Sequence, residues 1–367
     1  MKGHESLRRK ASSGKLLTDE VERCYSSPNI ALRRYAHLAR IYWEKWGCTR
    51  VPYTRKLLLI LLLVGVVSVF LLYASKDDYD TSSCTAKENI QDAGPNTYTV
   101  IVNTFKRPDL LQKSIRHYAS CPNVDAIRVV WSEQDNNPPK EGNDSDSKFF
   151  SSCADVVYDQ HPTTSLSNRF RPISGLRTEA VFNVDDDVNV ECSSLDFAHQ
   201  AWQLAPDALV GFIPRLHRKT ASGTFTYRRW WTVVMEGAYS IILTKACFMH
   251  RDYLALYSET VPREAIDFID KGRNCEDIAM QFAVANHTGR PPLWVVGRYT
   301  DAGAFDGIST TGSGILGHRA RRDDCVTTFV ELYGRDPLVV AHNYVISAGS
   351  LWAFLRPPVW IEWFAFP

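Results

Sequence analysis

From residue 98 onward, short β-branched runs alternate with helical segments. The run "YTVIVNTF" (98–105) suits a buried parallel strand, and Pro108, at a favoured first-turn position, opens the amphipathic segment "PDLLQKSIRHYA". Strands that alternate with helices in short steps predict an α/β fold with a mostly parallel central sheet and helices on both faces. We predict further strands at 126–131, 179–184 and 207–213, and a helix at about 194–204.

The strand predicted at 179–184 runs directly into three consecutive carboxylates, Asp185, Asp186 and Asp187. A solvated turn is the common explanation of such a triplet. The position favours a ligand site, because ligands of these sheets lie outside the carboxyl ends of the strands. Adjacent carboxylates also need solvent, a basic partner or a cation. Mn²⁺ or Mg²⁺ suits these oxygen ligands, together with the phosphates of a nucleotide diphosphate.

The order of the three aspartates suggests different roles for them. If the extended conformation continues, Asp185 and Asp187 share one side and Asp186 faces the other. We expect Asp187, the furthest out, to be a direct metal ligand, and Asp185 to contact the metal through a bound water, or the ribose. The metal would act as a Lewis acid on the departing diphosphate when a sugar is transferred.

The N-terminal part of the chain has the features of a membrane anchor. Residues 1–56 form a basic leader with thirteen Lys and Arg against five Asp and Glu, and the uncharged run 57–73 follows. We predict a transmembrane signal anchor at 57–74. A cleaved signal peptide is the alternative, but the long leader and the missing A-x-A pattern disfavour it. Basic residues before the span leave the N-terminus in the cytosol and the rest of the chain in the lumen.

The short span favours the thinner membranes of the early secretory pathway, so we expect a single-pass type II protein of the Golgi membrane. A polar luminal stem is predicted at 75–96, and an aromatic tail of unknown role at 346–367. A formal net charge of +1 argues against nucleic acid as an obligate partner.

Luminal exposure changes how the cysteines and asparagines are interpreted. Seven of the nine cysteines follow the span, so at least one is unpaired or bonded to another chain. The sequons at Asn143 and Asn286 predict a glycoprotein. Asn143 is the better candidate, because its surroundings are typical of a loop.

Two polar motifs in the C-terminal third of the chain allow a purely structural and a functional interpretation. In "NCEDIAM" (274–280), Asn274 and Asp277 form an acceptable capping pair for a helix. The motif "HRARRDD" (318–324) could be a solvated basic loop. In the functional interpretation, basic side chains of this motif neutralise a leaving diphosphate, a bidentate task suited to arginine. These side chains are His318, Arg319 and Arg322.

Seven motifs in this order resemble the exostosin-type glycosyltransferases of glycosyltransferase family 64, over roughly residues 97–345. They are "TVIVNTFKRPDLL" (99–111), "IRVVW" (127–131), "SLSNRF" (165–170), "VDDDV" (184–188), "DALVGFIPRLH" (207–217), "YSIILTKACF" (239–248) and "NCEDIAM" (274–280). The resemblance implies a GT-A nucleotide-sugar transferase fold at 97–345. A membrane anchor and a short stem directly before this domain resemble the arrangement in the single-domain branch of the family. That branch includes plant enzymes that glycosylate inositol phosphorylceramides.

The resemblance also implies roles for individual residues. The nucleotide is expected to contact five of them: Asn103, Arg107, Asn168, Arg169 and Asp186. The acidic triplet matches the metal and nucleotide motif.

The catalytic residues implied by the resemblance lie in "NCEDIAM". Asp277 matches the carboxylate beside the reacting anomeric carbon, and Glu276 stands where the family usually has a first aspartate. Cys275 matches a cysteine that is disulfide-bonded to one downstream, here Cys325.

The expected function is retaining, metal-dependent transfer of a sugar from a nucleotide diphosphate to a glycan or glycolipid. The single-domain branch favours GDP-mannose and glycosyl inositol phosphorylceramides. The alternatives are transfer of a UDP-linked N-acetylhexosamine and a non-catalytic membrane-tethered lectin or scaffold. Glu133 lies where relatives tend to have an amide near the base, which is compatible with a different nucleobase. Trp230 and Trp231 are equally compatible with an acceptor platform and with core packing.

Overall fold

The computed structural model describes residues 94–302 and 314–347, except for the side chains of residues 314–319. The predicted leader (1–56), membrane span (57–74) and nearly all of the predicted stem (75–96) and tail (346–367) lie outside these ranges. Within the described ranges, no helix is both long enough and apolar enough to cross a bilayer.

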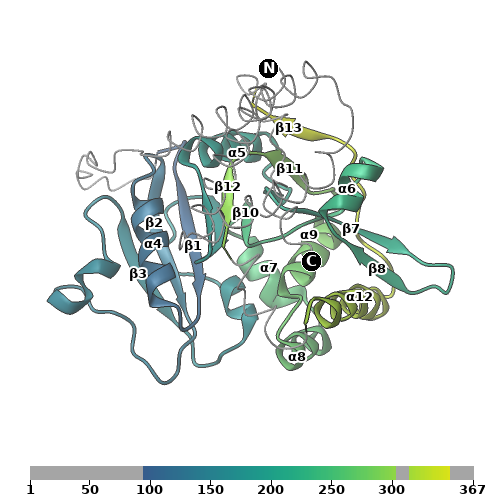
Figure 1. The fold of residues 1–367 in the computed structure, drawn as a ribbon, viewed down its shortest axis with the longest axis horizontal. Coiled ribbons are helices and arrows are strands. Elements are labelled where there is room, and N and C mark those ends of the chain that lie inside the picture. Colours follow the sequence, from purple (N-terminus) through teal and green to yellow (C-terminus); the bar gives the residue numbers. More distant parts are fainter. Residues whose placement is uncertain (1–93, 303–313, 348–367) are drawn as a thin grey trace, which may run out of the picture. The chain divides into compact units, whose positions relative to one another are not determined.

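The central element is an eight-stranded sheet with the strand order β13-β11-β6-β10-β4-β1-β2-β3 (Figure 1). Strand β10 is antiparallel to both of its neighbours, and the other strand pairs are parallel. The expectation of a mixed α/β fold with a largely parallel sheet is therefore confirmed. The strands are β1 (Tyr98–Thr104), β2 (Val124–Trp131), β3 (Asp155–Gln160), β4 (Ala180–Asp185), β6 (Val210–Gly211), β10 (Ala246–His250), β11 (Leu293–Val296) and β13 (Tyr344–Ile346).

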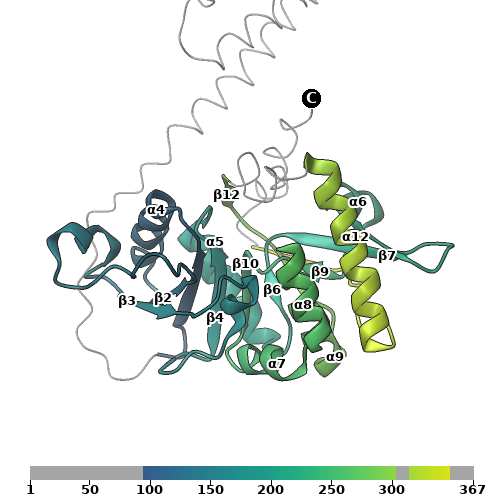
Figure 2. The same cartoon turned by 90° about the horizontal axis from the view of Figure 1, so that it is seen from below.

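Helices cover both faces of this sheet, and Figure 2 shows α4 and α5 on the side opposite α7 and α9. The alternation of side chains along β4 explains the division. Phe182 packs towards Tyr118 of α4, whereas Asn183 on the other face accepts a hydrogen bond from Arg169 of η2. The elements are α4 (Pro108–Ala119) and α5 (Cys192–Leu204) on one face, and η2 (Leu166–Phe170), α7 (Tyr253–Thr260) and α9 (Glu276–Thr288) on the other.

Helix α9 is buried over most of its length, because nine of its residues in a row, Asp277 to Ala285, are inaccessible. Eight of these nine are uncharged, which suits a helix packed on all sides. Asp277 is the exception at its N-terminal end. A buried carboxylate at such a place requires a partner.

Smaller elements surround the sheet. Strands β5 (Val188–Val190) and β12 (Tyr299–Asp301) form an antiparallel pair, and β7 (Pro214–Lys219) lies between β8 (Phe225–Arg228) and β9 (Ile241–Ile242). The remaining helices are η1 (Asp144–Phe149), α6 (Trp230–Glu236), α8 (Arg263–Gly272) and α12 (Gly314–Tyr333).

Most predicted elements are present with small shifts of their ends. The strand predicted at 207–213 is the exception, because only Val210–Gly211 pairs in the sheet and the next strand starts at Pro214. Gly211 is needed there, since an added Cβ would meet the carbonyl oxygen of Ala246 and lie 2.7 Å from Cγ2 of Ile242. Strand β3 was not predicted.

Disulfides join helices on both faces of the sheet. Cys121–Cys192 connects the end of α4 to the start of α5, and the predicted bond Cys275–Cys325 connects the start of α9 to α12. Cys153 is also disulfide-bonded. Among the cysteines of the described ranges, Cys247 is a buried free thiol, which agrees with the expectation of an unpaired cysteine.

Candidate active site

The acidic triplet lies at the carboxyl edge of the sheet, where β1 and β4 end side by side. Asp185 is paired in register with Asn103 of β1, and the strand ends there. Asp186 and Asp187 form a turn before β5. The condition for alternating sides is therefore not met, and the expectation that Asp186 faces away from Asp187 is wrong.

One arginine contacts both residues of this turn. Arg107 lies with Nη2 2.5 Å from Oδ1 of Asp186 and with Nη1 2.7 Å from Oδ2 of Asp187. The preceding residue, Lys106, has a φ of 55°, which turns the chain back after β1. Arg107, which was expected to contact the nucleotide, thus forms ion pairs with two residues of the acidic triplet.

Asp186 is the most deeply buried of the three aspartates and is anchored within the protein. Its Oδ2 accepts a hydrogen bond from Thr104 Oγ1 (2.6 Å), and its backbone N–H donates to the carbonyl of Asn103 (3.1 Å). Burial raises the pKa of Asp186 to about 7. We interpret Asp186 as a residue that fixes the turn. Asp185 and Asp187 are then the two carboxylates of the triplet that serve a ligand.

Arg169 connects the acidic triplet to the N-terminus of α9. Its side chain is 2% exposed, and Nη1 lies 2.8 Å from Oδ1 of Asp185 and 3.6 Å from Oε1 of Glu276. Its Nε donates to Oδ1 of Asn183 (3.1 Å). A single buried guanidinium therefore brings the predicted nucleotide and catalytic carboxylates together.

Glu276 and Asp277 begin α9 immediately after a strained backbone residue. Cys275 is the N-cap, with a φ of 80° and no capping side chain, so the alternative of an Asn274 cap is wrong. Oδ2 of Asp277 accepts a hydrogen bond from Arg322 (3.0 Å), and Oδ1 accepts one from the backbone N–H of Ile278 (2.8 Å). Burial, followed by the charge of Asp277, raises the pKa of Glu276 to about 7.

Arg322 belongs to α12, which the Cys275–Cys325 bond ties to the start of α9. Its Nη1 also donates to the hydroxyl of Tyr227 (2.8 Å), and its guanidinium lies 5.1 Å from the centre of that ring. The motif at 318–324 is thus helical, and the expectation of a solvated loop is wrong. The side chain of Arg319 lies outside the described residues, and its predicted role stays a prediction.

Two further residues singled out in the sequence, Asn168 and Glu133, have internal partners. The amide of Asn168 donates to Ser132 Oγ (3.0 Å) and to the carbonyl of Thr163 (2.7 Å). Glu133 accepts hydrogen bonds from the backbone N–H of Lys106 (2.6 Å) and from the amide of Asn136 (2.8 Å). The hydrogen bonds of both side chains therefore stabilise the loop after β2 and the loop before η2.

The two tryptophans of α6 differ in exposure. Trp230 is 7% exposed and packs in the interior, whereas Trp231 is 55% exposed. Of the two, Trp231 alone is open enough to contact an acceptor.

The site contains more acidic than basic groups. The ion pairs join six carboxylates to four basic side chains, which leaves a formal excess of two negative charges when all six carboxylates are ionised. The acidic members are Asp185, Asp186, Asp187, Glu276, Asp277 and Asp301, and the basic members are Arg107, Arg169, Lys245 and Arg322. Lys245 lies within the motif at 239–248 but was given no role there, and Asp301 lies outside the recognised motifs.

The donor set fits a hard divalent cation. Oδ1 of Asp185 and Oδ1 of Asp186 face the guanidinium groups of Arg169 and Arg107, whereas the buried Oδ1 of Asp301 accepts no hydrogen bond. In the described ranges, no group of three or more His, Cys, Asp or Glu side chains is arranged to hold a metal by itself. A magnesium-like ion needs only one or two carboxylates when substrate phosphates complete its shell.

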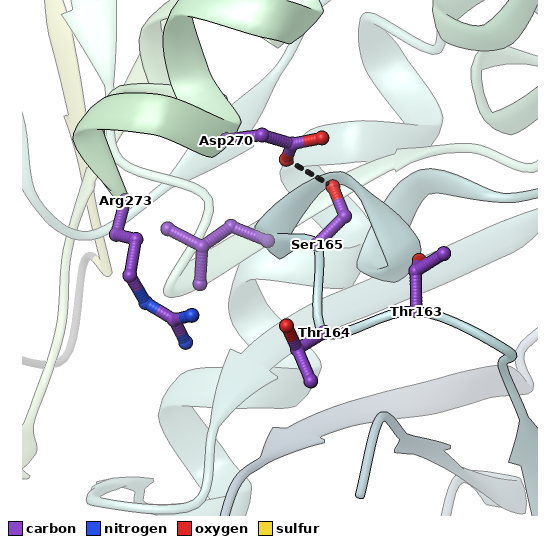
Figure 3. A pocket seen from close by; sticks show the side chains of 6 residues that line it. Thr163, Thr164, Ser165, Asp270 and Arg273 are labelled. Carbon is purple, nitrogen blue, oxygen red and sulfur yellow. Dashed lines mark hydrogen bonds between the residues drawn. The ribbon is translucent and has the colours of Figure 1, made fainter. Parts of the chain in front are cut away.

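A polar pocket lies next to these residues, between the loop before η2 and the end of α8 (Figure 3). Its volume is about 150 Å³. Ser165 donates a hydrogen bond across it to Oδ1 of Asp270 (2.5 Å). The lining residues are Thr163, Thr164, Ser165, Leu166, Asp270 and Arg273.

Comparison with known proteins agrees with this geometry. The model of the glycosyl transferase family 64 domain matches residues 98–349, which include the whole site. Glycosylinositol phosphorylceramide mannosyl transferase 1 of Arabidopsis thaliana is 39% identical over 308 residues, 80% of this chain and 89% of its own length. Exostosin-like 2 of Homo sapiens is 31% identical over 339 residues, 87% of this chain and 98% of its own.

A further relative places the match within a larger protein. Exostosin-2 of Homo sapiens is 32% identical over 252 residues, 67% of this chain but 33% of its own length. The chain therefore matches about a third of that protein's length. The chain belongs to glycosyl transferase family 64 and is a glycosyltransferase.

Proposed function

We propose that this enzyme transfers mannose from GDP-mannose to glycosyl inositol phosphorylceramides, with retention of the anomeric configuration and with Mn²⁺ or Mg²⁺ as cofactor. The name and 39% identity of the plant mannosyl transferase support the sugar and the acceptor class. The domain would have the GT-A architecture.

The observation that carries the proposal is the double contact of Arg169. This guanidinium pairs with Asp185 of the acidic triplet and lies near Glu276 of α9. A nucleotide sugar bound by its diphosphate at the triplet would therefore direct its sugar towards the start of α9. Asp277, the next residue, would stand beside the anomeric carbon, and Glu276 would bind the sugar.

The residues of the triplet have distinct proposed tasks. Asp187 and Asp185 would hold the metal ion, which supplies Lewis-acid stabilisation of the diphosphate when bound. Arg107 contacts Oδ2 of Asp187, so Oδ1 would serve the cation. Thr104 and Arg107 hold Asp186, which keeps the turn in place.

Both oxygens of Asp277 have partners that orient them, Arg322 and the N–H of Ile278. An oriented carboxylate can stabilise an oxocarbenium-like centre, because its charge needs no rearrangement during the reaction. The same carboxylate could act as nucleophile in a double displacement.

We propose in addition that residues 57–74 anchor the enzyme as a type II protein of the Golgi membrane, with the catalytic domain in the lumen. The anchor would keep the domain at the membrane that contains its lipid acceptor. Selective permeabilisation of cells, followed by protease treatment, tests this orientation, because only the leader would then be cleaved.

The test of the reaction uses the purified full-length chain with Mn²⁺ and a panel of GDP- and UDP-sugars. We expect transfer from GDP-mannose to a glycosyl inositol phosphorylceramide, and its loss after chelation. Asp277→Asn should abolish transfer while donor and Mn²⁺ binding remain, and Asp267→Asn, an exposed change on α8, should leave transfer intact. Near-normal turnover of Asp277→Asn would remove this residue from the mechanism. Transfer of a UDP-linked N-acetylhexosamine instead would support the alternative donor.

A further inference from the structure

The pocket at the end of α8 is continuous with the candidate donor site along two segments of the chain. Ser165 lies four residues before Arg169, and Arg273 lies three residues before Glu276. The segment that contains Ser165 therefore leads to Arg169, and the segment that contains Arg273 leads to Glu276. Arg169 and Glu276 are paired with each other at the candidate donor site.

A third segment approaches the pocket from β1. The guanidinium of Arg273 lies 5.7 Å from the centre of the Phe105 ring, and Phe105 precedes Arg107 by two residues. The face of an aromatic ring is a surface on which a flat heteroaromatic ring can stack, and a guanidinium beside it can bond the edge of that ring. The pocket thus adjoins such a surface on the side of the acidic turn.

Hydrogen bonds fix the polar residues of the pocket, one through its backbone and two through their side chains. Arg273 has a φ of 48° and caps α8, with its N–H donated to the carbonyl of Ile269. Asp270 accepts the hydroxyl of Ser165 at Oδ1, and each carboxylate oxygen can accept a second bond. Figure 3 shows the guanidinium of Arg273 and the hydroxyl of Thr164 turned towards the same space.

A carboxylate and a guanidinium that line one pocket are complementary to guanine. Guanine presents neighbouring N–H donors at N1 and N2, which a carboxylate accepts, and the acceptors O6 and N7, which arginine bonds in a bidentate manner. Uracil has a single ring N–H between two carbonyl oxygens, which would repel a carboxylate. A pocket lined by both groups can therefore distinguish the two bases by charge and by hydrogen-bond pattern.

We propose that Asp270 and Arg273 select a guanine nucleotide, with Asp270 bonded to the donor edge of the base and Arg273 to its O6 and N7. This assignment rests on the proposed function, since it presumes a nucleotide-diphosphate donor at the acidic triplet. It adds two specificity-determining residues from α8, an element outside the motifs recognised in the sequence.

Calorimetric titration of the full-length protein with GDP, inosine diphosphate and UDP, each with Mn²⁺, tests the assignment. Inosine diphosphate lacks only the N2 amino group of GDP. We expect the unchanged protein to bind GDP about tenfold or more tightly than either of the others, the discrimination typical of a good bidentate contact. Asp270→Asn should remove the preference for GDP over inosine diphosphate. Arg273→Gln should weaken both purine nucleotides equally, because both carry O6 and N7.

Matched controls lie on the same helix. Asp267 and Arg263 are exposed, pair with each other at 3.1 Å and do not line the pocket. Asp267→Asn and Arg263→Gln should leave all three affinities unchanged, and unchanged UDP binding in the pocket variants would show that their fold is intact.

Two results would overturn the assignment while leaving the enzyme class standing. One is a preference for UDP in the unchanged protein, and the other is an unaltered ratio of GDP, inosine diphosphate and UDP affinities in both pocket variants. Absence of binding by every nucleotide diphosphate in the presence of Mn²⁺ would instead refute the proposed function, and the base assignment with it.

Discussion

The guanidinium of Arg322 and the carboxylate of Asp277 lie 3.0 Å apart, although 45 residues separate them in the sequence. The side chains are 13% and 7% exposed, so the pair is largely shielded from water. It joins α12 to the first turn of α9. Removing either partner would leave the other charge in the interior, which is costly.

A double-mutant cycle measures this coupling. We expect Arg322→Gln and Asp277→Asn each to lower the free energy of unfolding, and the double variant to recover part of the loss, with a coupling energy of about 1–3 kcal/mol. Urea denaturation of the four proteins gives this value. The exposed pair Arg263 and Asp267 is the control, and its coupling should stay below about 0.5 kcal/mol. Equal coupling in the two pairs would contradict a buried ion pair.

The stability of the domain should depend on the ionisation of Glu276. Burial raises its pKa from 4.5 to about 7, so the folded state holds a proton that the unfolded state releases at lower pH. The resulting stabilisation is complete below pH 4.5 and is lost as the pH rises through about 7. Glu276→Gln should therefore be more stable than the unchanged protein at pH 8, by up to about 3 kcal/mol, and similar to it at pH 4.5.

Chemical denaturation at the two pH values, with a chelator present, checks this prediction. Glu264→Gln, an exposed change on α8, is the matched control and should not alter the pH dependence. A loss of stability in Glu276→Gln at pH 8 would mean that the ionised carboxylate is favoured in the fold.

The two disulfides of the described helices should differ in their effect on activity. Their sequence separations are 71 residues for Cys121–Cys192 and 50 for Cys275–Cys325, so replacing either pair by alanine should cost a similar amount, about 2–5 kcal/mol. Only the loss of Cys275–Cys325 releases α12 from the start of α9 and so moves Arg322 relative to Asp277. We expect a lower kcat for that variant alone, measured at a temperature where both remain folded. Equal kcat values would show that the helices hold the pair without the disulfide.

Gly211 should tolerate no side chain. Gly211→Ala places a Cβ against the backbone oxygen of Ala246 in the neighbouring strand, which cannot move without breaking the sheet, and we expect a loss of about 2 kcal/mol or more. Gly272→Ala is the control, because its Cβ would meet only Arg321 at 3.6 Å. That change should be neutral or stabilising by up to about 1 kcal/mol, owing to the better helix propensity of alanine. Thermal unfolding of both variants distinguishes the two cases.

Part of this fold could be predicted because its local signals are strong. The β-branched run of β1 and the proline at the start of α4 have one natural interpretation each, and both elements have the expected limits within a residue. Strand β3 escaped prediction because its side chains are half exposed and polar in part, as befits the edge of the sheet. The sequence also does not indicate that β10 is antiparallel to its neighbours, since its apolar residues would suit a parallel strand equally well.

The site was predictable at its carboxylates and less so at their partners. Three aspartates after a strand indicate a ligand edge, but a run of identical residues does not reveal where the strand stops. The partners depend on contacts between distant segments, such as Arg169 with Asn183 and Glu133 with Lys106. Asn168 was expected to contact the nucleotide, and Glu133 stands where relatives tend to have an amide near the base. The hydrogen bonds of both side chains are made with neighbouring loops.

The reversed direction of β10 determines which of its two ends takes part in chemistry. A parallel strand brings the residues that follow it to the ligand edge, whereas β10 brings the residues that precede it, so the carbonyl of Thr244 accepts a hydrogen bond from Arg169 (3.3 Å) and Lys245 pairs with Asp301. The far end of β10, at His250, pairs with Ala180, where β4 begins. An insertion ahead of Ala246 would therefore disturb the edge that contains the acidic triplet, while a graft beyond His250 would alter only the opposite rim of the domain.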